Sequence, residues 1–229
     1  MFVVLTYDVG VKRVSKVLKT CRKYMVHVQK SVFEGNISEA KLEKLKRELK
    51  KIILLEEARC RQQYYQMFRY FITKEGYEFV RRTKRPPMDK INALISFGNT
   101  LLYNRIQQFV WKTSLDSRIG VVHAANRRHY SLNLDFADLF KRIIVDRVIF
   151  TLVNKGIIND GCFVTNSDQS VYLSEQGKKV FIEHFQDKMY SKIKIGEKSY
   201  TYNQLIEKEI WKYQSYIRDG EKYQPYKYY

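Results

Sequence analysis

Short apolar runs and longer amphipathic stretches alternate over the first fifty residues of the chain. Residues 2–9 are rich in β-branched and aromatic side chains, a composition typical of a buried strand. Residues 11–24 carry apolar side chains at helical spacing opposite a basic face, and residues 25–35 alternate as one further strand that ends at Gly35. Ser38 is placed to cap the helix that follows. The apolar stripe of that helix consists of Leu42, Leu45, Leu49 and Ile52 or Ile53.

From this point to the C-terminus the pattern mainly predicts helices. Residues 84–90, KRPPMDK, interrupt it, because a residue that precedes proline disfavours the helical conformation. Residues 91–111 predict an apolar-rich helix or helix pair, and residues 115–130 predict a loop. The remaining predicted elements are a long helix over 135–156 closed by Gly156, a small hairpin within 157–173, and helices over 174–193 and 200–220.

The fold class that this order predicts is α+β with two parts. Two strands do not make a stable sheet on their own, so residues 1–53, read as β-α-β-α, are expected to form half of a small domain. One continuous helix then leads into a mostly α-helical bundle over residues 54–229.

Composition and charge narrow the expected partners. The 229 residues are 45% hydrophobic, which is enough for a core, and carry a net charge of +18. Such an excess of cations favours nucleic acid or an anionic membrane surface as partner. The three cysteines are far apart, and the sequence has neither a signal peptide nor an apolar run long enough to span a bilayer. These features predict a reduced protein of the cytoplasm without a membrane segment.

The residues with the clearest potential for chemistry lie between 120 and 141. Asp135 and Asp138 are three residues apart and so share one face of the predicted helix. His123 precedes them in a loop and could approach the same face. A histidine with carboxylates is a reasonable ligand set for Mg²⁺ or Mn²⁺. The alternative is that both aspartates form ion pairs on a solvated face, with Arg127, Arg128 or Lys141.

Several motifs, in the same order, resemble those of a known family. They are EARCRQQYY at 57–65, RRTKRPPMDKINALISFGNTLLYN at 81–104, LDSRIGVVH at 115–123, SLNLDFADLFKRIIVDRVI at 131–149 and LSEQGKKVFIEHF at 173–185. Together they resemble the C-terminal helical domain of the CRISPR spacer-acquisition integrase, CRISPR-associated protein one. The resemblance covers about residues 54–229.

The resemblance implies a site for Mg²⁺ or Mn²⁺ and assigns residues to it. Glu57 matches the glutamate of the family's E-G-x-A-R helix, and His123 matches its G-x-x-H. Asp135 and Asp138 match its acidic pair, with Asp138 the expected ligand. The chain departs from the family pattern at three positions, which affect the expected geometry and remove no ligand. They are Ala58 for a common glycine, Asp138 for a frequent glutamate and Arg142 for a frequent proline.

The first 53 residues resemble a different protein. They are similar to the first half of CRISPR-associated protein two, the small ferredoxin-like partner of the integrase, and Asp8 matches the aspartate of its YDV-type strand end. This resemblance implies a ferredoxin-like fragment, a homodimer that also binds a partner of that type, and an N-terminal metal ligand in Asp8. The more ordinary interpretation of Asp8 is a turn residue at the end of a strand.

Three functions follow as hypotheses. The resemblance implies a metal-dependent DNA endonuclease or integrase of CRISPR adaptation that acts on double-stranded or branched DNA, with Glu57, His123 and Asp138 as catalytic residues. The alternatives are a DNA-binding module without catalysis, which lacks the family's dimerisation scaffold, and a nuclease that works through Asp8. Candidate contacts to nucleic acid are Tyr64, Lys84, Arg85, Arg118, Arg127 and Arg128.

Overall fold

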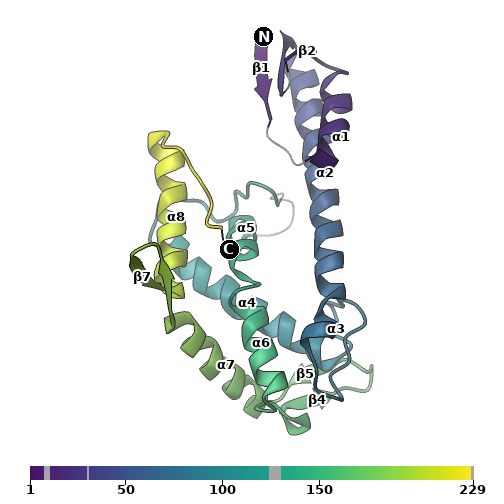
Figure 1. Cartoon of the computed structure of the whole chain (residues 1–229), viewed down its shortest axis with the longest axis vertical. Coiled ribbons are helices and arrows are strands. Elements are labelled where there is room, and N and C mark those ends of the chain that lie inside the picture. The colour runs from purple at the N-terminus through teal and green to yellow at the C-terminus, as the bar shows by residue number, and fades with distance from the viewer. Residues whose placement is uncertain (8–10, 30, 124–129, 228–229) are drawn as a thin grey trace. The chain divides into compact units, whose positions relative to one another are not determined.

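The computed structural model describes residues 1–7, 11–29, 31–123 and 130–227. The chain divides into two compact units, Met1–Tyr64 and Tyr65–Tyr229 (Figure 1). None of the helices in the described residues is long and apolar enough to cross a membrane.

The first unit is a three-stranded antiparallel sheet covered by helices. Its elements are β1 (Phe2–Thr6), α1 (Val11–Cys21), β2 (Val26–Gln29), β3 (Val32–Asn36) and α2 (Glu39–Gln66), the last turn of which continues past the unit's end. The strand order is β1-β3-β2, and Val4 pairs with Glu34 in the register of β1 and β3. The core holds Val17, Cys21, Met25, Phe33, Ile37 and Leu45.

One prediction for this unit is wrong. Residues 25–35 were expected to form a single strand, whereas they form most of a hairpin of β2 and β3. Alternation of apolar and polar residues has the same period in both arms of a hairpin, so the pattern does not reveal the turn between them. The third strand makes this sheet larger than the predicted pair of strands, and larger sheets are more stable.

The predicted start of α2 is confirmed. The Ser38 side chain accepts a hydrogen bond from the backbone N–H of Lys41, so it caps the first turn of the helix. Leu45 is fully buried, and Leu42 and Leu49 pack against the same core. Ile53 is half exposed, which places the end of the apolar stripe near residue 52.

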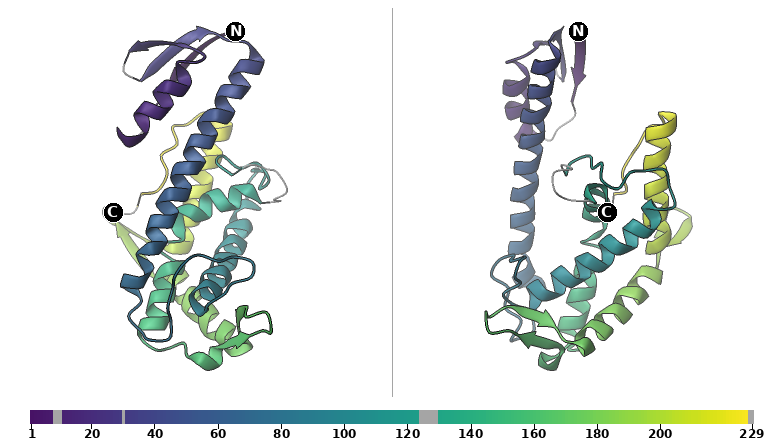
Figure 2. Two further views of the ribbon diagram at one scale, coloured as in Figure 1. Left: turned by 90° about the vertical axis from the view of Figure 1, so that its right-hand side faces the viewer. Right: turned by 180° about the vertical axis from the view of Figure 1, so that it is seen from behind.

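The second unit is mostly helical and carries two small hairpins (Figure 2). Its helices are α3 (Phe68–Phe71), α4 (Lys90–Val110), α5 (Ser131–Phe140), α6 (Val145–Asn154), a 3₁₀ turn (Asp160–Cys162), α7 (Glu175–Tyr190) and α8 (Tyr202–Asp219). The hairpins pair β4 (Phe163–Thr165) with β5 (Val171–Leu173), and β6 (Lys192–Ile195) with β7 (Lys198–Thr201). The hairpin expected within 157–173 is therefore confirmed.

The long helix α4 is the element on which the others pack. Its N-terminus is capped by Asp89, whose carboxylate accepts from the N–H of Asn92 at 2.7 Å. Helices α5, α6 and α8 all contact it. Gly98 lets α6 and α7 come close, because a Cβ atom there would lie 2.6 Å from Val145 and 2.7 Å from Phe181.

Two further predictions for this unit are wrong. The helix expected over 135–156 is two helices, α5 and α6, separated by a turn at 141–144. Phe140, Ile143, Ile144 and Val145 are all buried. At the turn the N–H of Asp146 donates to the carbonyl of Lys141, five residues before it, so the regular helical bonding to the fourth residue back is interrupted there. Gly156 does follow α6 with a φ of +66°, as its predicted capping role requires.

The second error concerns the boundary between the last two helices. The prediction ends the first of these helices at Ile193 and begins the second at Tyr200. In the structure the hairpin of β6 and β7 occupies this boundary. Lysines and isoleucines that alternate over 192–195 suit an exposed strand, but a segment this short also fits a helix end. The capping box of Thr201 and Gln204 marks the true start of α8.

Candidate metal centre

Helix α5 presents both predicted aspartates from a well-anchored position. Phe136, Ala137 and Phe140 are buried and fix the opposite side of the helix. The buried side chain of Asn133 donates a hydrogen bond to Gln107 of α4 at 2.6 Å. Two turns of α5 are thus tied to α4, so Asp135 and Asp138 project from a rigid element.

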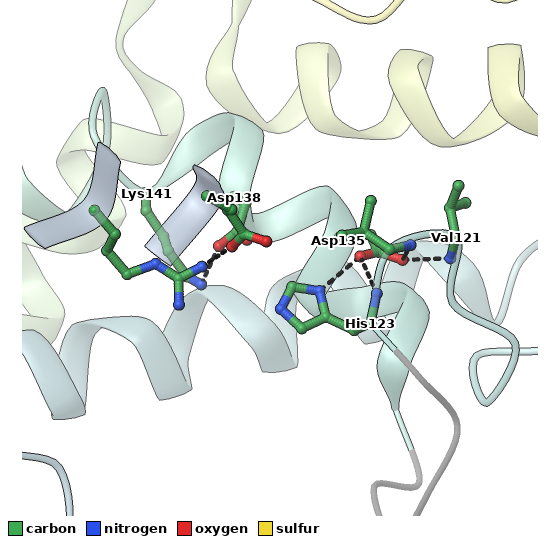
Figure 3. A network of polar contacts seen from close by, with 8 residues as sticks. Val121, His123, Asp135, Asp138 and Lys141 are labelled. Atoms are coloured by element: carbon green, nitrogen blue, oxygen red, sulfur yellow. Dashed lines mark hydrogen bonds and ion pairs between the residues drawn. The ribbon is translucent and has the colours of Figure 1, made fainter. Parts of the chain in front are cut away.

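His123 and Asp135 form a tight pair. The Nδ1 atom of His123 lies 2.7 Å from Oδ1 of Asp135, and the backbone N–H of His123 donates to the same oxygen at 3.1 Å (Figure 3). The other oxygen accepts from the N–H groups of Val121 at 2.5 Å and Val122 at 3.2 Å. Since a carboxylate only accepts, the pairing assigns the proton to Nδ1 and leaves the lone pair of Nε2 for a ligand.

These hydrogen bonds also stabilise the charge of Asp135. Burial alone raises the pKa of this carboxyl, since it disfavours the charged form. The hydrogen bonds from the side chain and backbone of His123, and from the N–H groups of Val121 and Val122, outweigh burial and lower the pKa below its ordinary value. Asp135 is therefore ionised at neutral pH.

Gly120 makes the loop of His123 possible. A Cβ atom at this position would lie 2.6 Å from the carbonyl oxygen of His123, 2.7 Å from Ser131 and 2.9 Å from Oδ2 of Asp135. The loop can wrap around the carboxylate only where residue 120 lacks a side chain. This requirement is visible in the sequence as the glycine of the G-x-x-H motif.

Asp138 has a cation as its neighbour. The ammonium of Lys141 lies 2.5 Å from Oδ1 of Asp138 and 4.9 Å from the centre of the Tyr103 ring. Burial lowers the pKa of Lys141, but Asp138 and Tyr103 outweigh it and raise that pKa overall. The predicted alternative of an ion pair with Lys141 is thus present in the structure for Asp138. Tyr103 was missed, because no local pattern links a residue of α4 to one of α5.

His123 and Asp138 come together at the same place. Each offers a ligand atom, and the two atoms lie within 4.8 Å of one another. An imidazole nitrogen and a carboxylate oxygen this close could share one divalent cation. Both side chains are partly buried, which limits competition from water.

The other predicted residues fall in different places. Glu57 lies on α2 in the first unit, where its carboxylate accepts from Arg61, and Tyr64 lies on the same helix. Arg118 is exposed and paired with Asp116 at 2.7 Å, and hydrogen bonds from Arg118 lower the pKa of Asp116 to about 2. Lys84 and Arg85 line an open cleft of the second unit. The remaining three lie outside the described residues: Asp8, Arg127 and Arg128.

The second unit is thus a helical domain that presents a histidine and a carboxylate from a loop and a helix over a buried core. The family model for CRISPR associated protein Cas1 matches residues 9–187 of this chain. The chain therefore belongs to the Cas1 family.

Individual relatives agree with this assignment. The chain is 40% identical over 173 residues to a protein from Thermodesulfovibrio yellowstonii named CRISPR-associated endonuclease Cas1 2. The match covers 74% of this chain and 52% of that protein. A structure of a Cas1 protein from Thermotoga maritima, TM1797, is similar with a TM-score of 0.67 and 28% identity, over 96% of this chain and 60% of that one.

A third similarity shows the fold alone. A casposase bound to an integration product is similar with a TM-score of 0.71 at 23% identity, over 80% of this chain and 55% of that one. The chain spans about half the length of the curated relatives it matches.

Proposed function

We propose that this chain is a divalent-metal-dependent DNA endonuclease or integrase of CRISPR adaptation. The observation that carries the proposal is the His123 side chain, held by Asp135 within 4.8 Å of a ligand atom of Asp138 in a chain of the Cas1 family. A histidine whose second ring nitrogen is bound by a carboxylate is the usual arrangement of a metal-binding histidine.

The proposed ligands of Mg²⁺ or Mn²⁺ are Glu57, His123 and Asp138. The resemblance to the family motif supports Glu57, and the local geometry of the second unit supports the other two. One imidazole nitrogen with carboxylate oxygens suits these hard cations. When bound, the ion would polarise a DNA phosphate and help to activate a water or a 3′-hydroxyl for in-line attack.

In this proposal Asp135 orients the His123 imidazole and does not itself bind the metal. Both of its oxygens accept hydrogen bonds from the His123 loop, so their lone pairs are largely engaged. Asp135 therefore holds the imidazole in one tautomer and one orientation. Lys141 balances the charge of Asp138 before the ion binds.

The chain's basic residues support DNA as the substrate. A net charge of +18 favours a polyanion, and the proposed phosphate contacts are those of the sequence prediction. They are Lys84, Arg85, Arg118, Arg127 and Arg128, with Tyr64 beside the strand. The proposed partners are double-stranded or branched DNA, a second copy of the chain and a protein of the CRISPR-associated protein two type.

The first unit supports the last of these partners. Its order of elements, β-α-β-β-α, is that of the ferredoxin-like β-α-β-β-α-β motif without the final strand. We propose that residues 1–53 correspond to the first half of such a domain and residues 54–229 to the integrase domain, although the family match extends into the first segment at residue 9.

A second candidate function is DNA binding without catalysis. The basic charge alone would sustain such binding.

Strand joining and cleavage of a labelled branched DNA in Mn²⁺ or Mg²⁺ test these functions. Wild type is compared with His123→Ala and, as a matched control, with His184→Ala, since His184 is bonded to the carbonyl of Val180 on α7. Products that vanish only in His123→Ala support the proposed site. Products that persist in His123→Ala contradict it and direct attention to Asp8. Salt-sensitive binding without products in any of the proteins supports the second candidate.

A further inference from the structure

The C-terminal segment of the chain returns from α8 to α5, the helix that carries Asp135 and Asp138. Helix α8 ends at Asp219, and Gly220 takes the left-handed conformation with a φ of +72°, which lets the chain reverse its direction. Residues 221–227 then form a strap that runs back from the end of α8 toward α5 (Figure 1, yellow). The strap has no helix or strand of its own, so its place depends on side-chain contacts.

One buried carboxylate fastens the strap to α8. Glu209 is 2% exposed, and a carboxylate so buried must be paired with other groups. Its Oε1 atom accepts from the hydroxyl of Tyr223 at 2.7 Å and from the N–H of Tyr226 at 2.9 Å, and its Oε2 atom pairs with Lys212 at 2.8 Å. The ammonium of Lys212 also donates to the carbonyl of Gln224 at 2.7 Å. The strap thus supplies two of the groups that make burial of Glu209 favourable.

The strap is linked to α5 through aromatic rings. The ring of Tyr226 stacks on Phe140, with centroids 5.9 Å apart and 8° between the ring planes. Tyr223 packs edge-on against Tyr213 of α8 at 5.4 Å, and Tyr213 packs edge-on against Phe136 at 5.6 Å. Phe136 and Phe140 are four residues apart, so both contacts reach the same face of α5.

That face lies opposite the proposed metal ligand of α5. Successive helical residues are turned by about 100°, so Asp138, two residues before Phe140, projects to the other side of the helix. There its ligand atom lies within 4.8 Å of that of His123. A shift of α5 on the strap side therefore changes the separation of Asp138 and His123.

A cleft beside α5 leaves room for such a shift. Its volume is about 490 Å³, and Asp135, Phe136 and Leu139 of α5 line it together with α8 and Pro225 of the strap. Close packing holds a helix in place because every movement meets a neighbour, and at the cleft α5 lacks these neighbours. Asn133 ties the first turn of α5 to α4, so the strap is the contact that holds the second half of the helix on this side.

We propose that the strap positions Asp138 next to His123 for the metal ion, with Glu209 and Tyr226 as the positioning residues. Neither is a ligand of the ion. Glu209 fastens the strap to α8, and Tyr226 transmits its position to α5. The inference rests on the proposed function for the metal centre, and it makes the affinity for the ion depend on a segment far from the ligands in the sequence.

The test measures Mn²⁺ binding to the full chain by isothermal titration calorimetry. Tyr226→Ala removes the ring from Phe140 and is expected to weaken Mn²⁺ binding about tenfold, the lower end of the loss typical of groups that orient metal ligands. Tyr226→Phe keeps the ring and is expected to bind Mn²⁺ as wild type does. Tyr190→Ala is the matched control, since it removes a ring that is 62% exposed at the end of α7.

A second variant tests whether Glu209 acts through the same segment. Glu209→Ala is also expected to weaken Mn²⁺ binding about tenfold. The double variant with Tyr226→Ala should bind about as weakly as either single variant, because residues that act as one unit do not have additive effects. Losses that multiply to about a hundredfold would contradict a single strap.

Unchanged Mn²⁺ affinity in Tyr226→Ala would overturn the proposal. Thermal unfolding of each variant in EDTA separates the two effects, since a lower melting temperature with unchanged Mn²⁺ affinity would make the strap a stabilising element only. Unchanged Mn²⁺ affinity in His123→Ala would instead overturn the metal centre, and this inference with it. Failure of the strap is thus distinguishable from failure of the proposed function.

Discussion

At the scale of single residues, the chemistry of the site depends on what Asp135 contacts. Its position three residues before Asp138 does not distinguish a metal ligand from a residue that supports one. Hydrogen bonds from His123 and from three backbone N–H groups make it the group that orients the imidazole. Asp138 forms an ion pair with Lys141, and an incoming cation can compete for the carboxylate.

Asp135→Asn tests this division of roles. The amide keeps the shape of the side chain but cannot stabilise the Nδ1–H tautomer with a negative charge, so we expect metal-dependent activity to fall 10–100-fold, by about the loss typical of such supporting groups. The Mn²⁺ concentration for half-maximal activity should rise, and excess Mn²⁺ should restore part of the rate. A variant that loses activity with an unchanged Mn²⁺ requirement would contradict a positioning role. Asp187→Asn, at an exposed position of α7, serves as the control.

Tyr77 gives a prediction for pH. It is buried and donates to the carbonyl of Ile158 at 2.9 Å, and burial, together with the charges of Asp160 and Cys162, raises its pKa to about 12. Because the pKa is raised in the folded state, the contribution of the neutral Tyr77 side chain to folding stability is complete below the ordinary pKa near 10. This contribution is lost as pH rises through 12. Tyr77→Phe should cost about 1–3 kcal/mol at pH 9, and the difference from wild type should shrink between pH 10 and 12. Urea unfolding at each pH measures this difference in the free energy of unfolding. A difference that stays constant with pH would contradict the raised pKa of Tyr77.

At the scale of elements, the close approach of α4, α6 and α7 positions the helix that carries the site. Gly98 permits this approach, and α5 is tied to α4 by the buried pair of Asn133 and Gln107. The C-terminal segment adds a further attachment, since the buried Glu209 of α8 accepts from Tyr223 at 2.7 Å and from the N–H of Tyr226 at 2.9 Å. The ring of Tyr226 stacks on Phe140 of α5.

Gly98→Ala should therefore destabilise the second unit. Alanine favours a helix by about 1 kcal/mol over glycine, but the added methyl would meet two side chains at less than 3 Å. Overpacking of a core commonly costs about 1–3 kcal/mol, so we expect a net loss in the free energy of unfolding. Thermal unfolding followed by circular dichroism measures this loss of stability. Gly161→Ala is the control, because its nearest contact would be 3.3 Å from a side chain. A more stable Gly98→Ala protein would show that the neighbouring helices can move apart.

At the scale of the whole molecule, binding of an ion by the proposed ligands is linked to the stability of the folded chain. Glu57 belongs to the first unit, and His123 and Asp138 belong to the second. An ion that binds the folded chain through all three would stabilise it by mass action. Such an effect reports on the ligand set without requiring catalysis.

We expect Mn²⁺ to raise the melting temperature of wild type. At a concentration 100 times the dissociation constant, binding to the folded state adds about 2.7 kcal/mol. Glu57→Gln and His123→Ala should each reduce the shift, whereas the exposed Glu183→Gln of α7 should not. A full shift in Glu57→Gln would remove Glu57 from the ligand set and leave the centre to the second unit.

The sequence by itself determined the helices with clear amphipathic periodicity, the cap of α2 at Ser38, the glycine after α6 and the small hairpin near residue 165. It also singled out His123, Asp135 and Asp138, because local spacing shows which residues share a face. Only the tertiary structure decided which partner each of them has. The path of the loop after Gly120, the turn between α5 and α6, and the contact of Tyr103 with Lys141 all depend on packing between segments far apart in the sequence. Local patterns carry no information about such contacts, since they reflect burial and spacing within one element.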